Sequence, residues 1–175
     1  MQLKYGFISV DDHVQEVPNL WIDRLKKKFG DRVPHLATTK DGSEQWFLDG
    51  QLLLDGRTAR AGALMADRNE DPKRWADVPA PAFTPSGAFE GNGCSAGIDY
   101  SVLYPTVAGL AGETFGRLQD SELEIACVQA YNDWLIDEWA SASDRFYPAV
   151  PRADLAGRSG DRRRSDARWA EAIAA

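Results

Sequence analysis

The chain has 175 residues, of which 43% are hydrophobic, and a formal net charge of −7 at pH 7. This length suits one domain with a core of its own, and the composition is that of a globular protein, not a disordered one. The negative charge argues against nucleic-acid binding and gives no electrostatic reason to bind an anionic membrane. Two cysteines provide no disulfide framework, and no apolar run approaches the ~18 residues of a membrane span. We therefore expect a cytoplasmic protein with neither nucleic acid nor membrane as a partner.

A short buried strand is predicted over residues 5–10, and it runs directly into Asp11, Asp12 and His13. Side chains alternate along a strand, so Asp11 and His13 should point to one side and Asp12 to the other. A carboxylate beside an imidazole at the end of a strand can form half of a divalent-metal site. The second histidine, His35, lies in a context more typical of a structural or exposed residue.

A helix is predicted over residues 19–30, with Asn19 as its N-cap and Gly30 as its stop. Two Asp-Gly pairs then indicate tight turns, and we expect a small antiparallel meander with strands at 36–39, 44–48 and 51–54. The proline- and glycine-rich stretch that follows, 57–96, is interpreted as a long surface loop with one helical turn at 63–68. It contains Cys94, which has no nearby base and is not expected to be a nucleophile.

A second strand is predicted over residues 97–106, and its continuous apolar character is typical of a buried parallel strand. The most regular helix follows over 121–140, where Ser121 and Glu124 have the spacing of a capping box and Cys127 falls on the apolar surface. A third strand is predicted at 144–150. Strands that alternate with helices in this way indicate parallel βα units.

Three stretches resemble the amidohydrolase-related family, in the branch that includes aminocarboxymuconate-semialdehyde decarboxylase and related metal-dependent hydrolases and decarboxylases. They are Ile8-Ser9-Val10-Asp11-Asp12-His13-Val14-Gln15-Glu16-Val17-Pro18-Asn19-Leu20-Trp21, the strand at 97–106, and Tyr131-Asn132-Asp133-Trp134-Leu135. The resemblance covers residues 5–150, with a loose fit over 57–96. It implies a (β/α)₈ barrel whose active site lies at the C-terminal ends of the strands.

The resemblance also implies roles for particular residues. Asp11 and His13 match the family's first-strand metal ligands, and the metal in such enzymes is usually zinc, acting as a Lewis acid. Thr106, at the end of the second strand, is the candidate on the substrate side. The substrate of full-length relatives is a small organic acid, and no catalytic residue is assigned in this chain.

The sequence departs from the family after its third strand. A full barrel needs ~200 residues at the least, and here only residues 151–175 remain, with no histidine among them. We therefore predict an α/β fold that is a partial (β/α)₈ barrel of about three strands, with the meander as an insertion. The metal site is expected to be incomplete. Residues 151–175 are interpreted as an atypical, poorly ordered tail of a truncated or frame-disrupted product.

Two other functions stay open at this point. One is a catalytically inactive fragment, which should self-associate through the open edge of its sheet. The other is a small α/β interaction module that uses the proline-rich loop as its binding surface. Tight binding of one zinc ion per chain would favour the enzyme instead.

Overall fold

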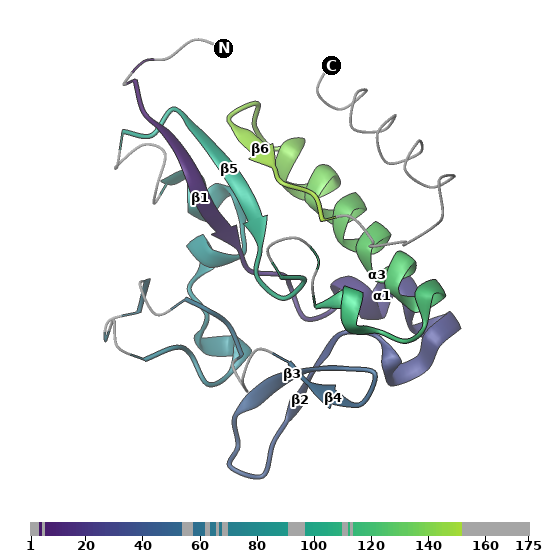
Figure 1. Ribbon diagram of the computed structural model, residues 1–175. Helices are drawn as coiled ribbons and strands as arrows, with labels where there is room; N and C mark the ends of the chain where they lie inside the picture. Colours follow the sequence, from purple (N-terminus) through teal and green to yellow (C-terminus); the bar gives the residue numbers. More distant parts are fainter. Residues whose placement is uncertain are drawn as a thin grey trace.

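The structure, a computed structural model, describes residues 4, 6–53, 58–61, 64–65, 67, 70–90, 97–109, 112 and 114–151. Within them the chain forms two three-stranded sheets and two main helices (Figure 1). The first sheet is parallel, with β5 (Tyr100–Pro105) between β1 (Ile8–Val14) and β6 (Phe146–Pro148). The second is antiparallel and contains β2 (His35–Thr38), β3 (Glu44–Leu48) and β4 (Gln51–Leu52) in sequence order. The predicted α/β class and three parallel strands are confirmed, and the strands described do not close into a barrel.

Strand β1 begins and ends later than the sequence predicted, because it continues through Asp11, Asp12 and His13 to Val14. Its pairing with β5 shifts between Ser9 and Asp12, where β1 contains a bulge. Backbone hydrogen bonds to β5 do not depend on the side chains, so they keep Asp11, Asp12 and His13 in the strand. The strand therefore continues past Val10, where the apolar residues stop. Bulges of this kind often lie beside functional sites and redirect a side chain.

The helix α1 (Leu20–Phe29) lies where it was expected, and Gly30 follows it with a φ of +62°. Asn19 is the N-cap residue, as predicted, but its side chain makes no capping hydrogen bond and instead donates a 2.6 Å hydrogen bond to Asp23. Trp21 is fully buried, and its Nε1 donates a 3.0 Å hydrogen bond to the backbone carbonyl of Cys127. This bond joins α1 to the long helix α3 (Ser121–Trp134).

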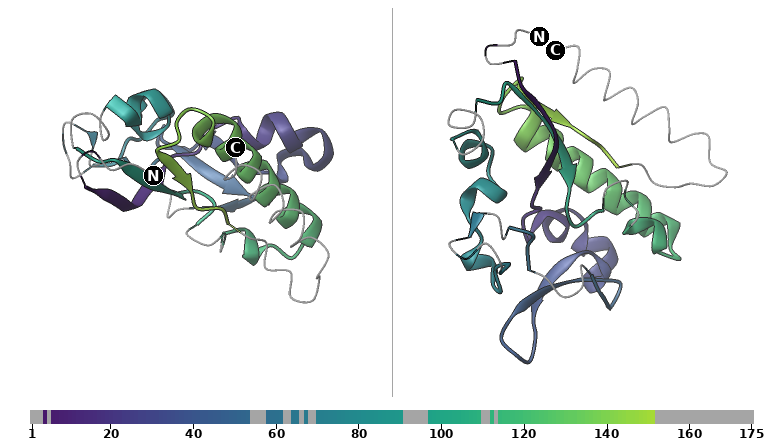
Figure 2. Two further views of the ribbon diagram at one scale, coloured as in Figure 1. Left: turned by 90° about the horizontal axis from the view of Figure 1, so that it is seen from above. Right: turned by 60° about the vertical axis from the view of Figure 1, so that its left-hand side comes forward.

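Helix α3 spans Ser121–Trp134 and continues as π-helical turns over Leu135–Ala140, which together match the predicted length. Its apolar stripes are buried, and it lies against the parallel sheet beside α1 (Figure 2). The predicted capping box is wrong. Asp120 is the N-cap, and its carboxylate accepts hydrogen bonds from the backbone N–H groups of Glu122 and Leu123. The cap is therefore one residue earlier than Ser121.

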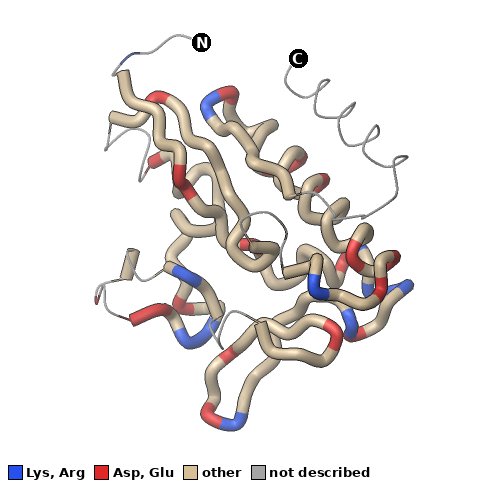
Figure 3. Tube along the Cα trace, viewed as in Figure 1, with Lys and Arg blue, Asp and Glu red and all other residues tan. Residues whose placement is uncertain are grey.

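The meander is confirmed, with β2 at His35–Thr38, β3 at Glu44–Leu48 and β4 at Gln51–Leu52. His35 is the first residue of β2, not the residue before it. Asp49 and Gly50 form the turn between β3 and β4, both with positive φ. Figure 3 shows that Lys and Arg residues gather around the meander and at the ends of α1 and α3, interspersed with acidic residues. In the parallel sheet β5 is mostly buried, whereas β1 is largely exposed, so the prediction of a buried strand at the start of the chain is wrong.

The prediction of a surface loop over 57–96 is only partly correct. The described part forms short helical turns at Trp75–Asp77, Ala80–Ala82 and Pro85–Ala88 (α2). A second small core lies here, made of Ala59, Ala61, Val78 and Ala82. These small apolar residues have no regular spacing, so the sequence did not reveal their burial. Cys94 and half of the predicted turn at 63–68 lie outside the described residues.

The tail predicted at 151–175 also lies outside the described residues, except for Pro151. In the part of the chain that the structure describes, no helix is both long enough and apolar enough to cross a membrane.

Candidate functional site

A cleft of about 750 Å³ lies at the C-terminal ends of β1 and β5. Asp11 and His13 of β1 line it together with Pro105 and Thr106, where β5 ends. The turn between β3 and β4 forms a second wall, and the chain before α3 forms a third, which includes Arg117. Every residue that the sequence proposed for the site therefore faces one cavity.

Asp11 and His13 form the polar pair at this cleft. His13 Nε2 lies 3.8 Å from Asp11 Oδ1, and the side chains are 44% and 85% exposed respectively. The bulge in β1 lies beside Asp11, yet the two side chains still project together. The sequence prediction that they share one side of the strand is confirmed.

The backbone fixes which nitrogen of His13 faces the cleft. His13 Nδ1 lies 2.9 Å from the carbonyl oxygen of Pro105, which can only accept, so Nδ1 carries the proton. The lone pair is then on Nε2, the nitrogen beside Asp11. A histidine that binds a metal usually donates its other ring N–H to a backbone carbonyl or a carboxylate in this way.

The spacing of the two side chains fits one metal ion with a small adjustment. Two ligand atoms bound tetrahedrally at ~2.0–2.1 Å from zinc lie about 3.3 Å apart. The observed 3.8 Å requires Asp11 to move by about half an ångström, and its exposed side chain is free to rotate. No group of three His, Cys, Asp or Glu side chains gathers anywhere in the described residues. The pair thus fits half of a metal site.

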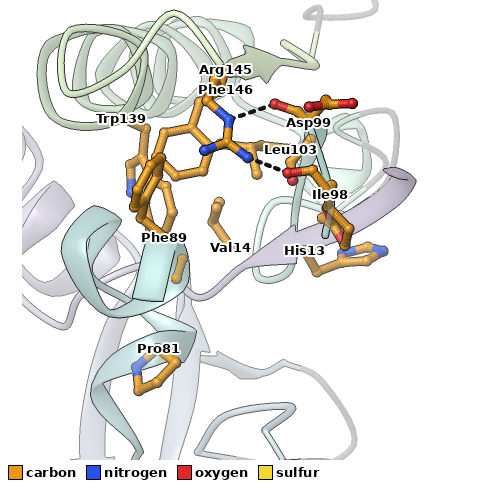
Figure 4. A pocket seen from close by; sticks show the side chains of 13 residues that line it. His13, Val14, Pro81, Phe89, Ile98, Asp99, Leu103, Trp139, Arg145 and Phe146 are labelled. Carbon is orange, nitrogen blue, oxygen red and sulfur yellow. Dashed lines mark hydrogen bonds between the residues drawn. The ribbon is translucent and has the colours of Figure 1, made fainter. Parts of the chain in front are cut away.

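Asp12 faces a different space. It lines a small cavity of about 30 Å³ between the parallel sheet and the turns before β5 (Figure 4). Arg145 crosses this cavity, stacks on Phe89 and donates to the backbone carbonyls of Ile98 and Asp99. The imidazole of His13 points away from Arg145 in this view. The prediction that Asp12 points away from Asp11 is therefore confirmed.

Thr106 lies at the cleft but is only 7% exposed. Its Oγ1 donates a 2.8 Å hydrogen bond to the carbonyl of Val14, and its backbone N–H donates to Glu16. The hydroxyl proton is thus used within the protein. What Thr106 still offers to the cleft is the acceptor side of its oxygen.

Gln15 and Glu16 are two buried polar residues beside the cleft to which the sequence analysis gave no role. Both lie directly after β1. Gln15 Oε1 accepts a 3.1 Å hydrogen bond from the backbone N–H of Arg60, which lines the cleft. Glu16 binds the loop after β5. The sequence contains one indication of their burial, because these two polar residues lie between Val14 and Val17 in an otherwise apolar stretch.

Glu16 is fully buried, and its carboxylate is surrounded by backbone N–H groups. Oε1 accepts from Thr106, Val107 and Ala108 at 3.2, 3.0 and 3.1 Å, and Oε2 accepts from Val107 at 2.9 Å. Burial raises the pKa of Glu16 from 4.5 to about 7, although these hydrogen bonds lower it. Tyr131 of α3 is close enough for the charge of Glu16 to raise its pKa, which burial already raises well above 10.

Two other residues considered from the sequence have structural roles. His35 Nδ1 lies 2.8 Å from the carbonyl of Val33, and its ring stacks on Phe47. Cys127 is in the core, and burial raises the pKa of its thiol to about 12. Such a thiol is inert at neutral pH, which agrees with the prediction that it is a core residue.

The fold is similar to that of an amidohydrolase from Mycobacterium avium subsp. paratuberculosis K-10, with a TM-score of 0.66 and 22% sequence identity. The similarity covers 99% of this chain and 49% of that protein, so this chain spans about half the length of the amidohydrolase. A scan of protein-family models and a search of curated proteins found no match. The chain therefore has an amidohydrolase-like α/β fold, and its similarity is one of fold.

Proposed function

We propose that Asp11 and His13 supply two ligands to a divalent metal ion, zinc, in an amidohydrolase-type site. The observation that carries this proposal is the state of His13. Its Nδ1–H is bound to the Pro105 carbonyl, so Nε2 presents a lone pair beside the Asp11 carboxylate in the cleft. When bound, the metal supplies Lewis-acid chemistry, activating water or polarising a carbonyl or carboxylate.

The reaction we propose is hydrolysis or decarboxylation of a small organic acid, as in the decarboxylase branch that the sequence resembles. The similarity of fold to an amidohydrolase and the cleft at the strand ends support it. Thr106 is proposed as a substrate-side residue, because it lines the cleft and its hydroxyl oxygen retains acceptor capacity. Function still depends on the site and not on the fold, so the metal is the first point to test.

A second candidate is a catalytically inactive protein that acts as an interaction module. It is favoured by the absence of a third ligand near Asp11 and His13 among the described residues. A metal held by two side chains is weakly bound and poorly positioned for chemistry. We therefore expect the chain on its own to have no appreciable turnover, with metal that is lost on dialysis.

Titration of the full-length chain with Co²⁺ and Zn²⁺ tests the proposal. We expect weak, saturable binding that is lost in His13→Ala and reduced in Asp11→Asn. His35→Ala is the matched control, because His35 also donates to a backbone carbonyl but lies on β2. Binding that survives His13→Ala would refute the metal site. One tightly held zinc per chain, or robust turnover that requires His13, would refute the expectation of weak binding and inactivity.

A further inference from the structure

His13 and Glu16 bind the two ends of one peptide group. The peptide group that joins Pro105 to Thr106 offers its carbonyl oxygen to His13 Nδ1 at 2.9 Å. The N–H of the same group donates to Glu16 Oε1 at 3.2 Å. The described chain contains no cis peptide bond, so this carbonyl and this N–H point in opposite directions. The imidazole, the peptide group and the carboxylate therefore form a single hydrogen-bonded chain.

The rest of the Glu16 environment makes this chain rigid. The neighbouring N–H groups of Val107 and Ala108 also donate to the carboxylate, which fixes three consecutive residues of the loop. Thr106 Oγ1 ties the same loop back to the Val14 carbonyl. Glu16 is fully buried, so water does not compete for these bonds.

Hydrogen bonds in such a chain polarise one another in a low-dielectric interior. A carboxylate that accepts from the N–H polarises the peptide group and increases the negative charge on its carbonyl oxygen. The carbonyl is then a stronger hydrogen-bond acceptor. A stronger acceptor at Nδ1–H holds the proton on that nitrogen and increases the electron density at Nε2. In metal sites the same effect is usually produced by a carboxylate bound directly to the histidine.

We propose that Glu16 is a positioning residue that acts on His13 through the Pro105–Thr106 peptide group, keeping the proton on Nδ1 and orienting Nε2 toward Asp11. The consequence for metal binding rests on the proposed function. The consequence for the histidine itself does not, because the tautomer exists with or without metal.

His35 offers an internal comparison. Its Nδ1 also lies against a carbonyl, that of Val33, but this peptide group joins Val33 to Pro34 and has no N–H. A carboxylate cannot act on His35 by this route. The two histidines thus differ in the one feature on which the proposal depends.

Asp99 provides the matched variant. Its buried carboxylate also accepts two backbone N–H groups, those of Lys4 and Gly6. It lies just before the start of β5, however, whereas Pro105 is at the end of that strand. Asp99→Asn therefore removes a carboxylate that accepts backbone hydrogen bonds, and it leaves the hydrogen bonds of the loop at Thr106 unchanged.

The experiment is ¹⁵N NMR of the histidine rings in the full-length chain, wild type, Glu16→Gln and Asp99→Asn, with Zn²⁺ titrated afterwards. We expect His13 to be an Nδ1–H tautomer in the wild type and to shift toward Nε2–H in Glu16→Gln, with His35 unchanged. Zn²⁺ affinity should fall about 10- to 100-fold in Glu16→Gln and stay unchanged in Asp99→Asn.

Circular dichroism establishes that each variant is folded. A folded Glu16→Gln with the wild-type tautomer and affinity would overturn the proposal, and so would an equal change in Asp99→Asn. If Glu16→Gln does not fold, the wild-type spectrum decides, because an Nε2–H tautomer at His13 contradicts the proposed chain. If the wild type binds no Zn²⁺, the metal site fails, while the tautomer shift still tests Glu16.

Discussion

Arg32 Nη1 donates a 2.9 Å hydrogen bond to the carboxylate of Asp120, the residue that caps α3. Arg32 Nε also donates to Asp49, in the turn between β3 and β4, at 2.7 Å. The other carboxylate oxygen of Asp120 accepts from the N–H groups of Glu122 and Leu123. The carboxylate of Asp120 thus caps the N-terminus of α3. Through Arg32 it also links α3 to the meander, which forms one wall of the cleft.

We predict that Asp120→Ala lowers the melting temperature by a few degrees, because it removes the N-cap and the partner of Arg32 together. Ser121→Ala should leave the melting temperature almost unchanged, since the structure gives Ser121 no capping role. Thermal unfolding followed by circular dichroism checks both. A larger loss in Ser121→Ala than in Asp120→Ala would restore the capping box that the sequence indicated.

The positions of the elements followed from local patterns, whereas the contacts between them did not. Hydrophobic spacing and the Asp-Gly pairs located α1, α3 and the meander, because those signals act within a few residues. The extension of β1 through Asp11, Asp12 and His13 depends on pairing with β5, which is about 90 residues away in the chain. No local pattern contains that information.

The same reasoning explains how much of the site was predicted. Asp11 and His13 were found because two metal-capable side chains two positions apart on a strand must project together. Glu16 was not found, since its role depends on three N–H groups of a loop that is distant in sequence. From the sequence alone, a buried glutamate cannot be distinguished from an exposed one, because its hydrogen-bond partners are not known. Long-range backbone contacts are what the sequence alone could not supply.

We expect the chain to self-associate through β1, with a second copy of the chain as the partner. Among the described strands β1 is at the edge of its sheet, and Phe7, Ile8 and Val10 beside or within it are 67%, 42% and 65% exposed. Exposed apolar residues on an edge strand favour pairing with another chain. Val10→Lys should therefore reduce the oligomer fraction measured by light scattering after size-exclusion chromatography.

Leu52→Lys is the control for that experiment. Leu52 is also an exposed apolar residue, at 49%, on the edge strand β4 of the other sheet. It should leave the oligomer fraction unchanged. A monomeric wild type would contradict self-association, and equal effects of the two lysines would show that β1 is not its specific surface.

We predict that Tyr131→Phe is neutral or stabilises the protein by up to ~1 kcal/mol. The hydroxyl of Tyr131 is buried and has no hydrogen-bond partner among the described residues, so removing it removes an unsatisfied polar group. Trp21→Phe is the contrasting variant, because the Nε1 of Trp21 donates to the Cys127 carbonyl. Trp21→Phe removes this hydrogen bond and leaves a gap where the fully buried indole packs, which should cost roughly 1–3 kcal/mol in urea unfolding. A clear loss of stability in Tyr131→Phe would show that the hydroxyl is bonded, with Glu16 as the neighbouring acceptor.

Glu16 should make the stability of the protein fall as the pH rises through neutrality. Its pKa is raised from 4.5 to about 7 in the folded state by burial. Between these values the folded state binds more protons than the unfolded state, so the free energy of unfolding decreases with rising pH. The stabilisation is fully present below pH 4.5 and is lost as the pH passes 7. Tyr131, the neighbouring group on α3, stays neutral throughout because its pKa is far above 10.

The measurement is urea unfolding of the wild type and Glu16→Gln at several values between pH 5 and pH 8. The difference between the two proteins isolates Glu16, since every other titrating group is common to both. We expect the wild type to lose on the order of 2–3 kcal/mol relative to Glu16→Gln across this range. Exposed acids with a lowered pKa, such as Asp41 with a pKa of about 2, stay ionised throughout this pH range. They therefore do not change the free energy of unfolding with pH here. A flat difference would mean that the hydrogen bonds from Thr106, Val107 and Ala108 outweigh burial and keep Glu16 ionised in this range.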